Sequence, residues 1–166
     1  IIAVLDEIKE DSRDAVAALV NMGMRVVMLT GDTRTTAEAI GKEVGIGEII
    51  SDVRPDGKEA AIRALQQSGT VAMVGDGIND APAIKHADVG IAMGVAGSEI
   101  TKETADVVLL DDSFATVVKT VSFGRNVYKN LQRFILFQLS VNLSALLFIT
   151  ICTLLNMPNP FNTLQL

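Results

Sequence analysis

Short apolar runs alternate with helical patterns over the first two thirds of the chain. The runs are rich in Val and Ile and lack clear polar alternation, which is typical of parallel strands covered on both faces. We expect strands at residues 1–5, 25–30, 48–53, 70–74, 89–93 and 107–110, and helices at residues 12–22, 35–44, 56–67 and 79–86. Repeated β–α units of this length predict an α/β fold with a parallel, doubly wound sheet.

The last third of the chain has a different pattern. No charged residue follows Arg133, and residues 134–155 are apolar apart from six polar side chains. At ~1.5 Å per residue, a helix of this length matches the ~30 Å hydrocarbon core of a bilayer. The alternative is a buried core helix of a larger soluble protein, although such helices are rarely this long without a charge.

These two patterns predict four segments. Residues 1–113 form the α/β domain, 114–133 a stalk helix, 134–155 a transmembrane helix, and 156–166 a turn and the start of a next membrane segment. The chain begins without Met and ends within an apolar run, so we expect it to be a fragment of a longer chain.

Charge is distributed unevenly along the chain. All 20 Asp and Glu residues lie at or before Asp112, and such an acidic domain argues against a nucleic-acid partner. Arg125, Lys129 and Arg133 recur every four positions just before the apolar segment. By the positive-inside rule, they predict that the acidic domain is cytoplasmic. They also fit a solvated stalk face, and both interpretations can hold.

Polar residues follow the expected strands at three places, where the carboxyl ends of parallel strands would collect ligands. Thr30-Gly31-Asp32 offers a hydroxyl, a flexible backbone N–H and a carboxylate, which can hold phosphate oxygens. Taken alone, this string also fits a structural turn.

The string Gly75-Asp76-Gly77-Ile78-Asn79-Asp80 carries more information. It places two carboxylates four residues apart, with an Asn before the second. Hard oxygen ligands that leave room for water are what Mg²⁺ prefers. The alternative is an Asp-Gly turn in which Asp80 caps a helix.

Lys58 lies early in an expected helix. A cation at that position interacts unfavourably with the helix macrodipole, so its presence is not explained by helix stability. A cation there could neutralise phosphate charge, as phosphoryl transfer requires. A solvated helix face is the alternative. Together, the hydroxyl, the ammonium and the carboxylates predict an Mg²⁺-assisted phosphoryl site.

These residues resemble those of P-type cation-transporting ATPases. Residues 28–32, 75–82 and 87–94 occur in the order and spacing of that family. The chain is similar throughout to the second part of the phosphorylation domain, which has a haloacid-dehalogenase-like fold, followed by the fifth transmembrane helix.

The resemblance implies ATP and Mg²⁺ as cofactors and a role for each matching residue. Thr30 and Gly31 would contact the phosphoryl group, Asp32 would help close the nucleotide site, and Lys58 would neutralise phosphoryl oxygens. Asp52 stands where the family has an Arg near its Val-x-Pro segment, which puts one nucleotide contact in doubt.

The remaining implied roles belong to the acidic string. Asp76 would ligate Mg²⁺, while Asn79 and Asp80 would orient the phosphoryl group and the metal. The catalytic set is therefore Thr30, Lys58, Asn79 and Asp80. The phosphorylated Asp of the family's Asp-Lys-Thr-Gly-Thr motif is absent, so we expect no ATP hydrolysis by the chain alone. The intact protein would form an aspartyl-phosphate.

Different segments of the chain resemble branches of the family that transport different cations. Residues 6–13 and 74–78 look like the heavy-metal branch, whereas 124–128 and 137–142 look like calcium pumps. Because the ion binds in the membrane half, we expect a Ca²⁺-transporting, multi-pass membrane protein. Asn142 is a polar group at mid-bilayer depth and a candidate ion ligand. An interhelical hydrogen bond is the alternative role for Asn142.

The expected partners are the transported cation, the lipid bilayer and the remainder of the pump chain. Three other functions remain possible from the sequence: a heavy-metal pump, a soluble haloacid-dehalogenase-like phosphatase, and a membrane-anchored binding module. The phosphatase needs an Asp-x-Asp motif on the first strand, and Leu5-Asp6-Glu7-Ile8 is a poor match to it.

Overall fold

The computed structural model describes residues 8–157. Contacts divide the chain into two compact units, Ile1–Thr120 and Val121–Leu166. The expected strand at residues 1–5 and most of the expected turn at 156–166 lie outside the described residues.

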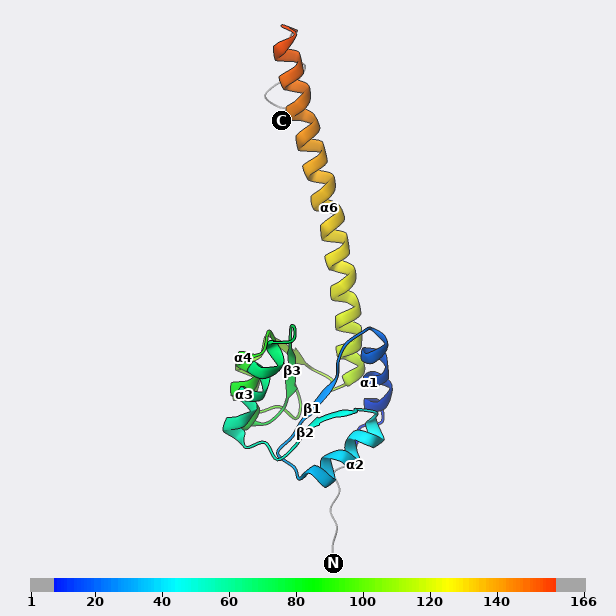
Figure 1. Ribbon diagram of the computed structural model, residues 1–166, viewed down its shortest axis with the longest axis vertical. Coiled ribbons are helices and arrows are strands. Elements are labelled where there is room, and N and C mark those ends of the chain that lie inside the picture. Colours follow the sequence, from blue (N-terminus) through cyan, green and yellow to red (C-terminus); the bar gives the residue numbers. More distant parts are fainter. Residues whose placement is uncertain (1–7, 158–166) are drawn as a thin grey trace, which may run out of the picture. The chain divides into compact units, whose positions relative to one another are not determined.

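The first unit alternates helices with short parallel strands (Figure 1). Its strands are β1 (Val27–Leu29), β2 (Glu48–Ile50), β3 (Ala72–Gly75), β4 (Val89–Met93) and β5 (Val107–Leu109). Its helices are α1 (Ser12–Asn21), α2 (Arg34–Val44), α3 (Pro55–Gln66), α4 (Ala81–His86) and α5 (Glu99–Thr104), and α6 (Phe114–Leu154) begins in this unit. The expected α/β class with parallel strands is confirmed.

The hydrogen bonds arrange the described strands as two sheets, where we expected one. The strand order is β1-β2 in one sheet and β3-β4-β5 in the other, with all pairs parallel. The two sheets are connected by side chains rather than by a backbone ladder. Leu29 of β1 packs against a buried cluster that contains Met73 of β3, Ile62 of α3, and Ala83 and Ile84 of α4.

Most helix ends follow from local sequence signals. Gly45 ends α2 with φ = 83°, a left-handed conformation that glycine adopts without a Cβ penalty. Pro55 opens α3, where its missing N–H costs nothing. A 3₁₀ turn at Ile78–Asp80 precedes α4, so this helix begins at Ala81 rather than at Asn79. Helix α5 was not expected, since its six residues are too few to show an apolar period.

Helix α6 contains the expected stalk and membrane segments without interruption. Within residues 8–157, it is the one helix long and apolar enough to cross a membrane, with a mean hydropathy of 2.1 over its most apolar 18 residues. The helix ends at Leu154, and Asn156 follows with φ = 56°.

Candidate functional site

A pocket of about 320 Å³ lies where three segments of the first unit meet. Gly31 follows β1, Lys58 lies in the first turns of α3, and Asn79 lies in the 3₁₀ turn after β3. The complete lining is Gly31, Asp52, Val53, Arg54, Pro55, Lys58 and Asn79. The structure therefore brings Lys58 together with one residue from each of the two strings that the sequence singled out, 30–32 and 75–80.

Backbone hydrogen bonds fix the loop after β1 against the loop after β2. The Val53 amide donates to the Thr30 carbonyl at 3.1 Å, and the Asp52 amide donates to the Asp32 carbonyl at 2.9 Å. A Cβ on Gly31 would lie 3.2 Å from the Val53 carbonyl oxygen, so the loops leave little room for a side chain there. The Gly31 backbone thus faces the pocket in a fixed position.

The Thr30 and Asp32 side chains are bonded to each other. The Thr30 hydroxyl donates to Asp32 Oδ2 at 2.9 Å and accepts from the Asp32 amide at 3.1 Å. Neither residue is part of the pocket lining. For Thr30 to donate to a phosphoryl oxygen, its hydroxyl hydrogen would have to leave Asp32.

Lys58 has a stabilising partner that was not predicted from the sequence. Its Nζ donates to Asp80 Oδ1 at 2.5 Å, and the two side chains are only 16% and 11% exposed. Asp80 Oδ2 accepts from the Gly77 amide at 3.3 Å. A Cβ on Gly75 would lie 2.9 Å from Asp80 Cβ, so the absence of a side chain there makes room for Asp80.

Asp76 is held through its backbone while its carboxylate stays free. Its carbonyl accepts from the Ser98 amide at 2.9 Å, and the next carbonyl, of Gly77, accepts from the Thr101 hydroxyl at 2.9 Å. The Asp76 side chain is exposed and makes no hydrogen bond or ion pair within residues 8–157. It lies outside the pocket lining, three residues before Asn79.

The described residues can supply part of a magnesium site. They contain no group of three or more His, Cys, Asp or Glu side chains placed to hold a metal ion. Mg²⁺ keeps several waters and is usually bound by one or two carboxylates together with phosphate oxygens. The unpartnered Asp76 carboxylate fits that role, whereas both oxygens of Asp80 are already engaged.

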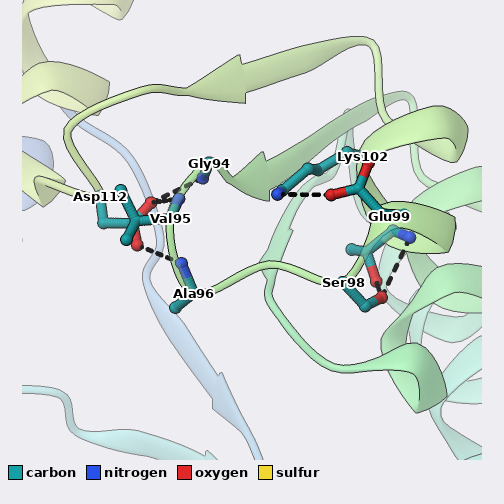
Figure 2. Close-up of polar contacts among 8 residues, drawn as sticks. Gly94, Val95, Ala96, Ser98, Glu99, Lys102 and Asp112 are labelled. Atoms are coloured by element: carbon teal, nitrogen blue, oxygen red, sulfur yellow. Dashed lines mark hydrogen bonds and ion pairs between the residues drawn. The ribbon is translucent and has the colours of Figure 1, made fainter.

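Two sets of contacts were not predicted from the sequence: those between the start of α5 and residues 75–80, called the acidic loop below, and those of Asp112 after β5. Asp112 receives three backbone amides, from Gly94 at 2.6 Å, Val95 at 3.0 Å and Ala96 at 2.7 Å (Figure 2). These donors lower the pKa of the Asp112 carboxyl, and Lys9 adds a smaller effect in the same direction. The glycine-rich string after β4 was the one signal that could have revealed this contact.

A second carboxylate, from the segment before α1, caps the start of α6. Asp11 Oδ2 accepts from the Ser113 hydroxyl at 2.6 Å and from the Ala115 amide at 3.2 Å. These two bonds lower the pKa of Asp11. Lys9 adds a third tie by donating to the Asp112 carbonyl at 2.7 Å. The first turn of α6 is therefore fixed to the segment before α1.

Arg54 was also missed as a candidate. It lines the pocket beside Lys58 and makes no ion pair among the residues that the structure describes. Asp52, which also lines the pocket, has φ = 56°. The pocket therefore presents one cation already paired with a carboxylate and a second that is exposed.

Breaking the Lys58–Asp80 pair should destabilise the protein by about 3 kcal/mol, because either single change leaves a largely buried charge without its partner. We expect Lys58→Met and Asp80→Asn to cost less together than the sum of their separate effects in urea unfolding. The exposed pair Arg34–Glu38 is the control, with an expected coupling of about 0.3–0.5 kcal/mol. A coupling energy at Lys58–Asp80 no larger than that of the control would show that burial does not make these two charges depend on each other more than an exposed pair does.

The three hydrogen bonds from the amides of residues 94–96 to the Asp112 carboxylate should be lost only in acid. Because the folded-state pKa is lowered, Asp112 stabilises the fold above the ordinary carboxyl range and ceases to do so as pH falls through the folded pKa. Hydrogen exchange, corrected for its intrinsic pH dependence, should show constant protection of these amides near neutral pH and loss in acid. Asp112→Asn should expose them at neutral pH, whereas Asp106→Asn, which loses one amide contact to Gly90, should not. Unchanged protection of these three amides in Asp112→Asn would show that the Asp112 carboxylate does not hold them.

Two family models match the chain. Both are described as haloacid dehalogenase-like hydrolase, and they cover residues 1–88 and 58–121. The first alone covers more than half of the chain.

Curated relatives match over nearly the entire chain. It is 37% identical, over 99% of its length, to the P-type sodium-transporting ATPase4 of Toxoplasma gondii. It is also 37% identical, over its whole length, to the human calcium-transporting ATPase type 2C member 1. The chain covers 15% and 21% of these two proteins, so it spans about a fifth of their length or less.

The solved structures that match the chain are also ATPases. A zinc-transporting PIB-type ATPase in an E2.Pi state matches 93% of the chain with a TM-score of 0.81 and 36% identity, over 24% of its own length. The catalytic domain of the CPx-ATPase CopB-B matches 67% of the chain with a TM-score of 0.62 and 35% identity, over 45% of its own length. The expected resemblance to P-type ATPases is confirmed, and the chain belongs to the haloacid dehalogenase-like hydrolase family.

Proposed function

We propose that this chain is the catalytic-loop and membrane-helix portion of an ATP-driven P-type cation pump. In this proposal, residues 1–113 belong to the phosphorylation domain, 114–133 form the stalk, 134–155 cross the bilayer, and 156–166 lead to the next membrane segment. The observation that carries the proposal is the convergence of Gly31, Lys58 and Asn79 on one pocket. Phosphoryl transfer depends almost entirely on such positioning and on charge stabilisation.

The pocket residues would bind and orient a phosphoryl group from ATP. The Lys58 ammonium has three N–H donors, of which Asp80 takes one, so two remain for phosphoryl oxygens. The Gly31 backbone and the Asn79 amide would hold further oxygens, with Thr30 and Asp32 beside them. Asp76 would ligate Mg²⁺, which supplies charge neutralisation at those oxygens. The aspartate that accepts the phosphoryl group would lie in the rest of the intact protein.

The exposed apolar surface of α6 supports a place in a membrane. The side chains from Phe134 to Phe137 are each at least half exposed, and the most apolar stretch of the helix has no buried residue. Such a surface is unfavourable in water, which argues against a soluble phosphatase. The basic residues Arg125, Lys129 and Arg133 support a cytoplasmic position for the first unit.

The transported cation in this proposal is Ca²⁺. The human relative that matches over the full chain is named as calcium-transporting. On α6, the hydroxyls of Ser140, Ser144, Thr150 and Thr153 each donate to the carbonyl four residues earlier. Within residues 8–157, the Asn142 side chain donates to no helix carbonyl, and its one hydrogen bond there is accepted from Gln138 at 3.4 Å. The Asn142 side chain is therefore not satisfied by its own helix, which supports a role as an ion ligand.

A heavy-metal pump is the second candidate. It is favoured by the TM-score of 0.81 to a zinc-transporting PIB-type ATPase. The two candidates share the phosphoryl site and differ only in the ion that stimulates phosphorylation.

Asp76→Asn in the full-length protein should abolish the Mg²⁺-dependent phosphoenzyme formed from radiolabelled ATP. The substitution removes the one free carboxylate of the acidic loop and leaves its backbone contacts in place. Asp14→Asn, an exposed carboxylate in the first turn of α1, is the control and should phosphorylate normally. Undiminished phosphoenzyme in Asp76→Asn would refute the proposed function.

Asn142→Ala should raise the Ca²⁺ concentration needed for half-maximal phosphorylation by about tenfold or more, because a metal site loses an oxygen donor. Ser144→Ala is the matched control, since that hydroxyl is already satisfied within α6. Phosphorylation stimulated by Zn²⁺ and not by Ca²⁺ would select the heavy-metal pump instead. Equal Ca²⁺ dependence of the two variants would remove Asn142 from the ion site.

A further inference from the structure

The peptide that carries Asp76 rests on the first turn of α5. Two successive carbonyls, those of Asp76 and Gly77, accept hydrogen bonds from the Ser98 amide and the Thr101 hydroxyl, both at 2.9 Å. Thr101 has 0% of its surface exposed. The Gly77 carbonyl also accepts from the Asp80 amide at 2.9 Å, within its own turn. The buried Thr101 hydroxyl adds the contact that fixes this carbonyl against α5.

Counting hydrogens assigns the direction of the neighbouring bond. A threonine hydroxyl has one hydrogen, and that of Thr101 goes to the Gly77 carbonyl. The Ser98 hydroxyl must therefore donate across the 2.6 Å contact to Thr101 Oγ1. Ser98 Oγ in turn accepts from the Thr101 amide at 3.2 Å and caps α5. The result is a directed chain of hydroxyls from Ser98 through Thr101 to Gly77.

The segment that leads into α5, and so carries these two hydroxyls, is itself held in place. Asp112 holds the amides of residues 94–96, immediately before α5 (Figure 2). Gly97 follows in a space too small for a side chain, because an added Cβ would lie 1.9 Å from the Met93 carbonyl oxygen. The segment that leads into α5 is thus held by contacts of its own, which are separate from those that α5 makes to Asp76 and Gly77.

We propose that Thr101 is a positioning residue that fixes the Gly77 carbonyl, next in the chain to Asp76, and thereby aims the free Asp76 carboxylate at Mg²⁺. The inference rests on the proposed function, in which Asp76 ligates that ion. Thr101 touches neither the metal nor the phosphoryl group and acts through backbone atoms alone. Partners that orient a metal ligand typically change metal affinity 10–100-fold when they are removed.

The test uses the full-length protein with three substitutions. Thr101→Val removes the hydroxyl with little change in shape, and Thr101→Ser keeps the hydroxyl. Thr104→Val is the matched control, because the Thr104 hydroxyl donates to the Ile100 carbonyl within α5. One readout is hydrogen exchange of residues 75–80 without Mg²⁺ or nucleotide, and the other is the Mg²⁺ dependence of phosphorylation at fixed ATP.

We expect Thr101→Val to speed exchange of residues 75–80 and to raise the Mg²⁺ concentration for half-maximal phosphorylation about tenfold. Thr101→Ser and Thr104→Val should match the unmodified protein in both readouts. If Thr101→Val does not fold, Ser98→Ala takes its place. This variant removes the hydroxyl that orients Thr101 but keeps the hydrogen bond from the amide of residue 98 to the Asp76 carbonyl. We therefore expect a smaller rise in the Mg²⁺ requirement.

Two results would overturn the positioning role. One is Thr101→Val behaving like Thr104→Val in both readouts, and the other is Thr101→Ser being as defective as Thr101→Val. The exchange readout needs neither metal nor turnover, so it judges Thr101 separately from the pump. If Asp76→Asn abolishes phosphorylation while Thr101→Val leaves Mg²⁺ dependence and exchange unchanged, the positioning role fails and the proposed function stands.

Discussion

The ion pair between Lys58 and Asp80 connects the two halves of the candidate site. One partner belongs to α3 and the other to the turn after β3, and both side chains are largely buried. Two buried charges are tolerated only as a pair. The same contact therefore holds Lys58 beside Asn79 in the pocket and requires Gly75 to lack a side chain, because Asp80 occupies that space.

Sequence patterns predicted what local rules control. The strands from 25 to 110 and the end of α2 at Gly45 follow from apolar runs and from the conformation of glycine. The positions of Thr30, Asp76 and Lys58 at strand and helix ends follow from the same rules. Because the strands are parallel, the loops after them were expected to lie close together, although Thr30 and Asp76 themselves lie outside the pocket lining.

The features that could not be predicted from the sequence depend on contacts between distant residues. Lys58 and Asp80 are 22 positions apart, so no local period indicates that the Lys is paired. Helix α5 has six residues, and its role depends on Thr101 meeting the Gly77 carbonyl 24 positions away. The division of the strands into two sheets is also a matter of pairing, which an apolar run does not encode.

The carboxylates of the first unit divide into two kinds, and this division indicates which of them does chemistry. Asp11, Asp80 and Asp112 are each satisfied by amides, hydroxyls or an ammonium, and donors of this kind lower the pKa of Asp11 and Asp112. The Asp76 carbonyl and the Gly77 carbonyl that follows it both accept hydrogen bonds, whereas the Asp76 carboxylate has no partner among residues 8–157. A metal ligand must be rigid where it is attached and unsatisfied at its tip, since a partner inside the protein would compete with the ion. Among the carboxylates on this edge of the fold, Asp76 combines both properties, which is why a phosphoryl site that uses Mg²⁺ would be built around it.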